Sequence, residues 1–220
     1  MTPYYQDDLI TLYLGSCLTI TEWTSADVLI TDPPYGVGGN LTTTTGTHEW
    51  DKTLDVRDQA LAMFLSGGAR GDELERPYAM FASPRRLDGA VPYRGLPLVW
   101  DKGDSVGMGD TRFPWRPNYE LIYVSGPGWE GRRTSSVLRV PLSSKAATQE
   151  GHPTPKPIGL MRMLIEKAPP GVIADPFAGT GSTLLAAKQL GRRAIGVELD
   201  PTYAAHAVSR LAQDALDLGI

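Results

Sequence analysis

The sequence contains one cysteine, no apolar stretch of membrane-spanning length and no cluster of residues with metal-ligand spacing. Cys17 cannot form an internal disulfide, and the first residues, MTPYYQDDLI, lack the basic and apolar blocks of a secretory signal, so we expect a cytoplasmic protein. A bilayer requires roughly 20 consecutive apolar residues, and no segment approaches that length, so we predict no membrane insertion. Without His, Cys and carboxylate residues at ligand spacing, we also predict no metal site.

The net charge is small, but its distribution is uneven. The 220 residues carry a formal charge of −4, which by itself argues against a nucleic-acid partner, because phosphate contacts require lysine and arginine. Between Arg76 and Lys156, however, 12 Lys and Arg stand against 7 Asp and Glu. This excess supports DNA binding, although solvated loop arginines explain it equally well. The candidate DNA contacts are Arg85, Arg86, Arg112, Arg116, Arg132, Arg133 and Arg139.

Short apolar runs alternate with helical patterns along the chain. Strands are predicted at residues 9–14, 28–30, 78–81, 97–100, 119–124, 172–174 and 194–198, and helices at 54–65, 157–166, 182–190 and 201–216. This alternation predicts an α/β fold with a mostly parallel sheet and right-handed crossovers. The length suits one domain, residues 1–220, with residues 125–151 as a small excursion from its core.

An early strand ends in TDPPYG, residues 31–36. An exocyclic amine on a nucleobase is a poor nucleophile because its lone pair is delocalised into the ring. Two acceptors aimed at its hydrogens favour a tetrahedral nitrogen, and Asp32 with the Pro33 carbonyl, fixed by Pro33 and Pro34, would supply them. Tyr35 offers a face on which an extruded base can stack. The alternative is an ordinary Asp-Pro turn with Tyr35 as packing.

A late strand ends in ADPFAGTGST, residues 174–183. Gly179 and Gly181 would let a ligand approach the backbone, and the helix that begins near Ser182 favours an anionic group at its N-terminus. The next strand ends at Glu198, 17 residues beyond Gly181, where a carboxylate can bind both hydroxyls of a ribose. No lysine follows the glycines, which disfavours a phosphate-binding loop. A plain strand-helix turn is the alternative.

Together with HPTPKP (152–157) and GVELD (196–200), these motifs resemble the DNA adenine-N6 and cytosine-N4 methyltransferases of the permuted beta group, in which DPPY precedes FxGxG. The resemblance spans nearly the whole chain. It implies a single-domain, Rossmann-like AdoMet-dependent methyltransferase fold with a seven-stranded sheet in circularly permuted order. The resemblance also implies that the catalytic, base-binding residues are Asp32, Pro33, Pro34 and Tyr35. S-adenosyl-L-methionine (AdoMet) binding falls to Asp175, Phe177, Gly179, Gly181, Ser182, Glu198, Thr154, Lys156 and Cys17.

The resemblance implies methylation of a flipped base in DNA, as in restriction-modification systems. The DPPY form favours adenine N6, and cytosine N4 is the alternative. The motif order and Asp32 both disfavour methylation of protein glutamine or of RNA. A non-enzymatic alternative is a regulator that binds AdoMet and DNA without catalysis. Residues 125–151 leave little space for target recognition. Hence we expect either a short, relaxed recognition sequence or a contribution from residues 36–58 and the second subunit of a homodimer.

Overall fold

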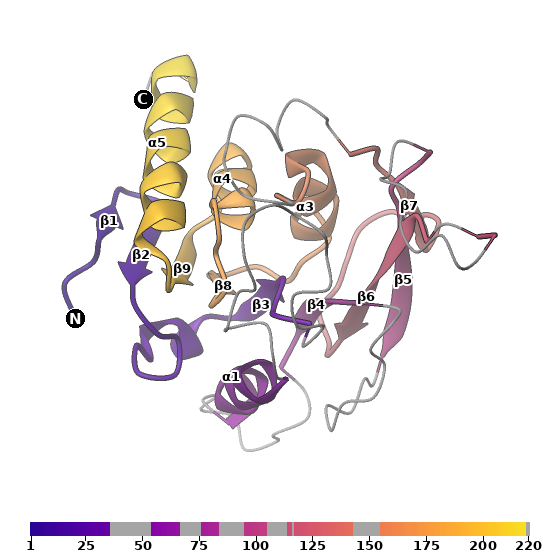
Figure 1. The fold of residues 1–220 in the computed structure, drawn as a ribbon, viewed down its shortest axis with the longest axis horizontal. Helices are drawn as coiled ribbons and strands as arrows, with labels where there is room; N and C mark the ends of the chain where they lie inside the picture. The colour runs from indigo at the N-terminus through magenta and orange to yellow at the C-terminus, as the bar shows by residue number, and fades with distance from the viewer. Residues whose placement is uncertain are drawn as a thin grey trace.

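The structure is a computed structural model that describes residues 1–35, 54–66, 76–83, 95–104, 114–115, 117–142 and 155–218. Within these residues nine strands form one sheet in the order β1-β2-β9-β8-β3-β4-β6-β5-β7 (Figure 1). The strands are β1 (Tyr5–Gln6), β2 (Ile10–Leu14), β3 (Val28–Thr31), β4 (Tyr78–Ala82), β5 (Leu96–Asp101), β6 (Tyr119–Ser125), β7 (Val137–Arg139), β8 (Ile173–Asp175) and β9 (Ala194–Glu198).

Seven of the described strands run in one direction, and only β1 and β6 run against their neighbours. The α/β fold with a mostly parallel sheet is therefore confirmed. The expected strand number was wrong, because nine strands are described instead of seven. The two additional strands lie at the edges of the sheet. β1 has 2 residues and β7 has 3, too few to show an alternating pattern in the sequence.

Helices cover both faces of the sheet. On one face lie α3 (Ile158–Ile165), α4 (Ser182–Gln189) and α5 (Pro201–Leu218), and on the other lie α1 (Asp55–Ser66) and the short 3-10 helix η1 (Glu22–Ser25) (Figure 1). Side chains alternate across a strand, so β3 sends Val28 and Ile30 into the core under α3 and α4, and Leu29 into the core with α1 and η1. Both faces are buried, which explains why the first three residues of the strand, Val28, Leu29 and Ile30, are all apolar.

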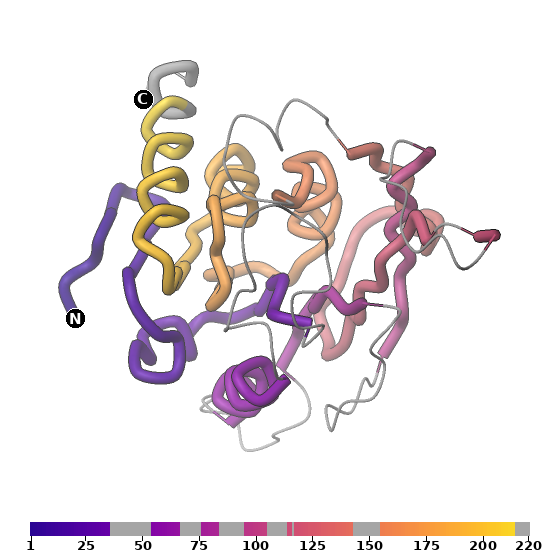
Figure 2. Tube along the Cα trace, viewed as in Figure 1, coloured from indigo at the N-terminus to yellow at the C-terminus, as the bar shows by residue number. Residues whose placement is uncertain are grey.

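Segments far apart in the chain lie side by side in the sheet. The first strand and the last helix occupy the same side of the molecule (Figure 2). In the centre, β3 pairs in parallel with β8, with Val28 opposite Ile173 and Leu29 opposite Ala174. The chain passes outward from this pair in both directions, through β9 on one side and β4 on the other. Open α/β sheets bind ligands at the carboxyl ends of strands at such a point.

Residues 125–151 were interpreted as an excursion from the core, and the described part contributes to the sheet. Strand β7 pairs in parallel with β5, and Leu138 joins the core, with 6% of its surface exposed. No helix within the described ranges has the length and apolarity needed to cross a membrane.

Candidate functional site

The two sequence motifs meet at the carboxyl ends of β3 and β8. The hydroxyl of Thr31, the last residue of β3, donates to Oδ1 of Asp175, the last residue of β8, at 2.7 Å. Thr31 and Asp175 are both almost fully buried. Asp32 follows Thr31 directly, so the Asp32–Tyr35 turn, called the base-binding corner below, and the glycine turn at Gly179 and Gly181 share one end of the sheet. Parallel pairing places both strand ends at the same edge.

Both carboxylate oxygens of Asp32 already accept from side chains of the protein. The Tyr35 hydroxyl donates to Oδ1 at 2.5 Å, and the Lys156 ammonium lies 2.5 Å from Oδ2. The Asp32 side chain is 28% exposed, whereas that of Lys156 is only 6% exposed. Pro33 and Pro34 are buried behind it. The catalytic candidates Asp32 and Tyr35 are thus held together by direct contact.

A second carboxylate, that of Glu120 on β6, lies beside Asp32. Its Oε2 is 3.1 Å from Lys156 Nζ and 3.2 Å from the Tyr35 hydroxyl, and its Oε1 is 2.5 Å from Lys102 Nζ. The motif-based reasoning did not include Glu120 or Lys102 among the site residues. The segments WDK (100–102) and YELI (119–122) contain both residues, but only the strand pairing brings them together, with Trp100 opposite Glu120. Glu120 then contacts Lys102, Lys156 and Tyr35.

This cluster balances two carboxylates against two ammonium groups in a largely buried space. Lys156 and Lys102 hold the pKa of Glu120 below its ordinary value against the cost of burial. Burial and the Glu120 charge raise the pKa of Asp32, although Lys156 opposes the rise. The two carboxylates in turn raise the pKa of Lys156, so it stays charged despite its burial.

Aromatic rings surround the Lys156 ammonium. It lies 5.0 Å from the centre of the Phe81 ring and 5.7 Å from that of Trp100, and these two rings meet edge to face. Aromatic faces favour a nearby cation. Lys156 was predicted to bind the carboxylate of the cofactor's methionine part. Within the protein it contacts Asp32, Glu120 and Tyr35, so a cofactor contact of Lys156 stays a prediction. Thr154 of the same motif lies outside the described residues.

The cofactor candidates Asp175 and Glu198 close the other side of the site. Burial raises the pKa of Asp175 to about 6, although Thr31 and the backbone N–H of Phe177 both donate to it. Glu198 accepts the N–H of Gly179 on Oε2 at 2.6 Å and the N–H of Asp200 on Oε1 at 2.8 Å. Two carboxylates at adjacent strand ends disfavour a phosphate and suit a ligand with ammonium and hydroxyl groups.

The glycine turn is shaped partly by packing of the protein itself. Gly179 and Gly181 have φ of 52° and 80°, which glycine adopts without strain. A Cβ added to Gly181 would lie 3.0 Å from that of Ala207 on α5, so this glycine permits close packing as well as the turn. Ser182, which opens α4, lies 3.5 Å from an Arg210 nitrogen. A ligand contact of Gly181 or Ser182 stays a prediction.

Cys17 lies in the turn after β2, close to the same site. Its side chain is buried, and burial raises the pKa of the thiol to about 11, with further contributions from Glu198 and Asp175. Its backbone carbonyl accepts the indole N–H of Trp23 at 3.0 Å. Cys17 is therefore an un-ionised neighbour of the cofactor candidates.

The structure separates the described arginine candidates into two groups. Arg139 ends β7 opposite Asp101, at the same end of the sheet as Asp32, and its side chain is 79% exposed. Arg132 and Arg133 belong to a loop whose Glu130 N–H donates to the Lys167 carbonyl, beyond the far end of α3. The 8 residues of α3 alone span about 12 Å. Arg132 and Arg133 thus lie at the end opposite Asp32, and Arg85, Arg86, Arg112 and Arg116 lie outside the described residues.

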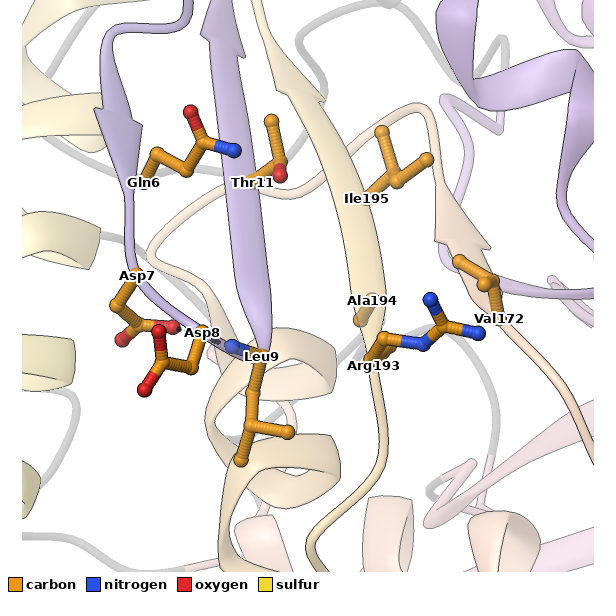
Figure 3. A pocket seen from close by; sticks show the side chains of 9 residues that line it. All are labelled: Gln6, Asp7, Asp8, Leu9, Thr11, Val172, Arg193, Ala194 and Ile195. Atoms are coloured by element: carbon orange, nitrogen blue, oxygen red, sulfur yellow. Dashed lines mark hydrogen bonds between the residues drawn. The ribbon is translucent and has the colours of Figure 1, made fainter.

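A pocket of about 250 Å³ opens at the amino ends of β2 and β9, lined among others by Asp7, Asp8 and Arg193 (Figure 3). It lies at the opposite end of the sheet from Asp32 and Asp175, which end their strands. One of its carboxylates already forms an ion pair within the protein, since Lys188 Nζ lies 2.7 Å from Asp7 Oδ2. Over the described ranges, no group of three or more His, Cys, Asp and Glu residues could hold a metal ion.

Comparison with known proteins agrees with this geometry. Residues 99–209 match the family model described as DNA methylase, for N6 and N4 methyltransferases. "Putative methylase YubD" from Escherichia coli (strain K12) is 30% identical over 216 residues, covering 90% of this chain and 88% of that protein. Type II methyltransferase M.ScaI from Streptomyces caespitosus is 24% identical, covering 98% and 86%.

Solved structures share the fold. The M1.HpyAVI–SAM complex superposes with a TM-score of 0.65 at 22% identity, covering 92% of this chain and 99% of that one. The cytosine-N4-specific PvuII DNA methyltransferase gives a TM-score of 0.68 at 16% identity, covering 94% and 88%.

Proposed function

The chain belongs to the N6/N4 DNA methylase family and is an AdoMet-dependent DNA methyltransferase, and from this premise we propose that it methylates the N6 amine of a flipped adenine. The observation that carries the proposal is the Thr31–Asp175 hydrogen bond, since it fixes the base-binding corner against the cofactor candidates. Adenine is favoured by the DPPY form of the corner. Cytosine N4 is the second candidate, because it presents the same exocyclic amine to the same acceptors.

The residues of the corner have distinct tasks in this reaction. Asp32 and the Pro33 carbonyl accept the two amine hydrogens, which localises the nitrogen lone pair. Tyr35 stacks on the extruded base. Bound AdoMet would supply an electrophilic methyl group, whose transfer would form a nitrogen–carbon bond as the sulfur–carbon bond breaks. The nitrogen then loses one proton. Asp32, which accepts from the amine in this proposal and whose pKa is raised by burial, is the carboxylate that would take it.

The opposite wall fits AdoMet. Asp175 would hold the ammonium of its methionine part, and Glu198, already oriented by two backbone N–H groups, would accept from the ribose hydroxyls. Phe177, Gly179 and Cys17 would line this wall, and support comes from the hydrogen bond of Gly179 to Glu198 and from the packing of Cys17 and Phe177 in one cluster. Ser182 opens the following helix. AdoMet carries no phosphate, which agrees with the two carboxylates and with the missing lysine in the turn.

Among the described arginines, Arg139 is the one we propose for DNA contact, because it is exposed and lies at the catalytic end. Exposed Trp115 is a further stacking candidate. Residues 125–151, which include Arg139, would then contribute to target recognition. We also propose a homodimer, in which the second subunit completes the recognition surface. A cytoplasmic location suits a protein with one buried cysteine. Sedimentation with and without duplex DNA tests the homodimer.

Tritium transfer from methyl-labelled AdoMet to unmethylated DNA, followed by nucleoside analysis, tests the proposal. We expect label in N6-methyladenine, loss of transfer in Asp32→Ala, and AdoMet affinity within about twofold of the parent, because Asp32 is placed on the base side. Asp8→Ala, at an exposed carboxylate in the opposite pocket, is the matched control. A parent that binds DNA and AdoMet without transfer would establish a regulator instead.

A further inference from the structure

The catalytic carboxylate is covered before any base arrives. The Tyr35 hydroxyl occupies Oδ1 of Asp32 and the Lys156 ammonium occupies Oδ2, each at 2.5 Å. A base amine needs at least one of these oxygens. Each carboxylate oxygen can accept about two hydrogen bonds, and one place on each is taken here, so a base amine competes with the internal donors and gains the whole of Oδ1 only if Tyr35 moves.

Tyr35 is the donor that can move. It must also present its ring to the base, whereas Lys156 is buried among Phe81, Trp100 and two carboxylates. A hydroxyl that leaves Oδ1 needs another acceptor, because a buried donor without a partner costs free energy. Glu120 Oε2 lies 3.2 Å from that hydroxyl, already within hydrogen-bond distance, so it can take the hydrogen bond when the O–H turns about the Cζ–O bond.

Glu120 is well suited to receive it. The Lys102 ammonium lies 2.5 Å from Oε1 and the Lys156 ammonium 3.1 Å from Oε2, and these contacts keep the carboxylate ionised and in place. Hydrogen bonds to an ionised acceptor are stronger than those between neutral groups. The position is also fixed by the backbone, since Glu120 lies within β6 opposite Trp100.

We propose that Glu120 is a positioning residue that takes the Tyr35 hydroxyl from Asp32 when the target base enters. Asp32 is then free to accept from the amine while Lys156 remains on its other oxygen. Glu120 acts through Tyr35 and touches neither the base nor the cofactor. The inference rests on the proposed transfer to an exocyclic amine, and it holds equally for adenine and cytosine.

A double-mutant cycle between Glu120 and Tyr35 tests this role. Glu120→Gln keeps the shape but removes the charge, and we expect the transfer rate at saturating AdoMet and unmethylated DNA to fall about tenfold, the scale of one charge-assisted hydrogen bond. In a Tyr35→Phe background, where no hydroxyl covers Asp32, the same change should cost less than about threefold. The AdoMet dissociation constant should stay within about twofold throughout.

Controls separate this role from a structural one. Asp8→Asn, at an exposed carboxylate in the pocket at the opposite end of the sheet, should keep the parent rate. Equal losses from Glu120→Gln in the two backgrounds would overturn the proposal, because damage to the fold does not depend on the Tyr35 hydroxyl. If Glu120→Gln does not fold, Lys102→Gln loosens the same carboxylate, and its loss should likewise shrink with Tyr35→Phe.

The same experiment distinguishes failure of the two proposals. A parent that transfers no label to any base refutes the proposed reaction and this role with it. A parent that transfers label while Glu120→Gln retains its full rate refutes only the role of Glu120.

Discussion

The buried carboxylate of Asp175 should make the stability of the ligand-free protein depend on pH. Its side chain is almost fully buried, and its pKa rises from 3.8 to about 6 because burial penalises the charged form. Between these values the folded chain binds a proton that the unfolded chain does not. Lowering the pH through about 6 therefore stabilises the folded state. Asp175→Asn removes this titration while keeping the side-chain shape.

The size of the effect follows from the two pKa values. One pKa unit corresponds to about 1.4 kcal/mol, so the shift from 3.8 to about 6 amounts to about 3 kcal/mol in full. Between about pH 7.5 and about pH 5 the protein gains about 1.4 kcal/mol of this. The neutral variant gains none. The difference in free energy of unfolding between variant and parent should therefore shift by about 1.4 kcal/mol in favour of the parent over this range.

Urea unfolding followed by tryptophan fluorescence at matched pH values measures this difference, and other titrating groups cancel in the comparison. Asp8→Asn, at an exposed carboxylate, is the control and should show no such change. The variant should also bind AdoMet at least about tenfold more weakly, since it loses a charge-assisted hydrogen bond worth about 1.5–3 kcal/mol. A difference in unfolding free energy that stays constant from about pH 7.5 to about pH 5 would refute the burial argument.

Two further changes test the turn and the DNA-facing edge. Gly181→Ala should lower the free energy of unfolding by about 1–2 kcal/mol, because φ is 80° and the new Cβ meets Ala207. Gly159→Ala, in open space within α3, should raise the free energy of unfolding by about 0.5–1 kcal/mol. Thermal unfolding compares the two variants, and equal effects would contradict the packing described. Arg139→Gln should weaken DNA binding and reduce its salt dependence by about one phosphate contact, while Arg133→Gln should change neither. Fluorescence anisotropy over a salt series measures both. A loss of binding in Arg133→Gln but not in Arg139→Gln would place DNA at the other end of the sheet.

Local patterns were sufficient to predict most of the elements. The apolar run 28–30 predicts β3 because a strand buried on both faces is mostly apolar. The glycine turn before Ser182 predicts the start of α4. The edge strands β1 and β7 were missed for the opposite reason. With 2 and 3 residues they carry no period, and they form only because a neighbouring strand offers hydrogen bonds.

The sequence by itself determined the chemistry available at each corner: a carboxylate between a strand and two prolines at Asp32, and a glycine turn with acids at Asp175 and Glu198. Only the tertiary structure decided which groups meet. Lys156 is 124 residues from Asp32 and lies against it because α3 starts at the carboxyl edge of the sheet. Glu120 reaches the same lysine because β6 runs antiparallel beside β4, whereas Arg133 lies at the opposite end of the sheet. Such contacts depend on strand order and direction, which no local pattern contains.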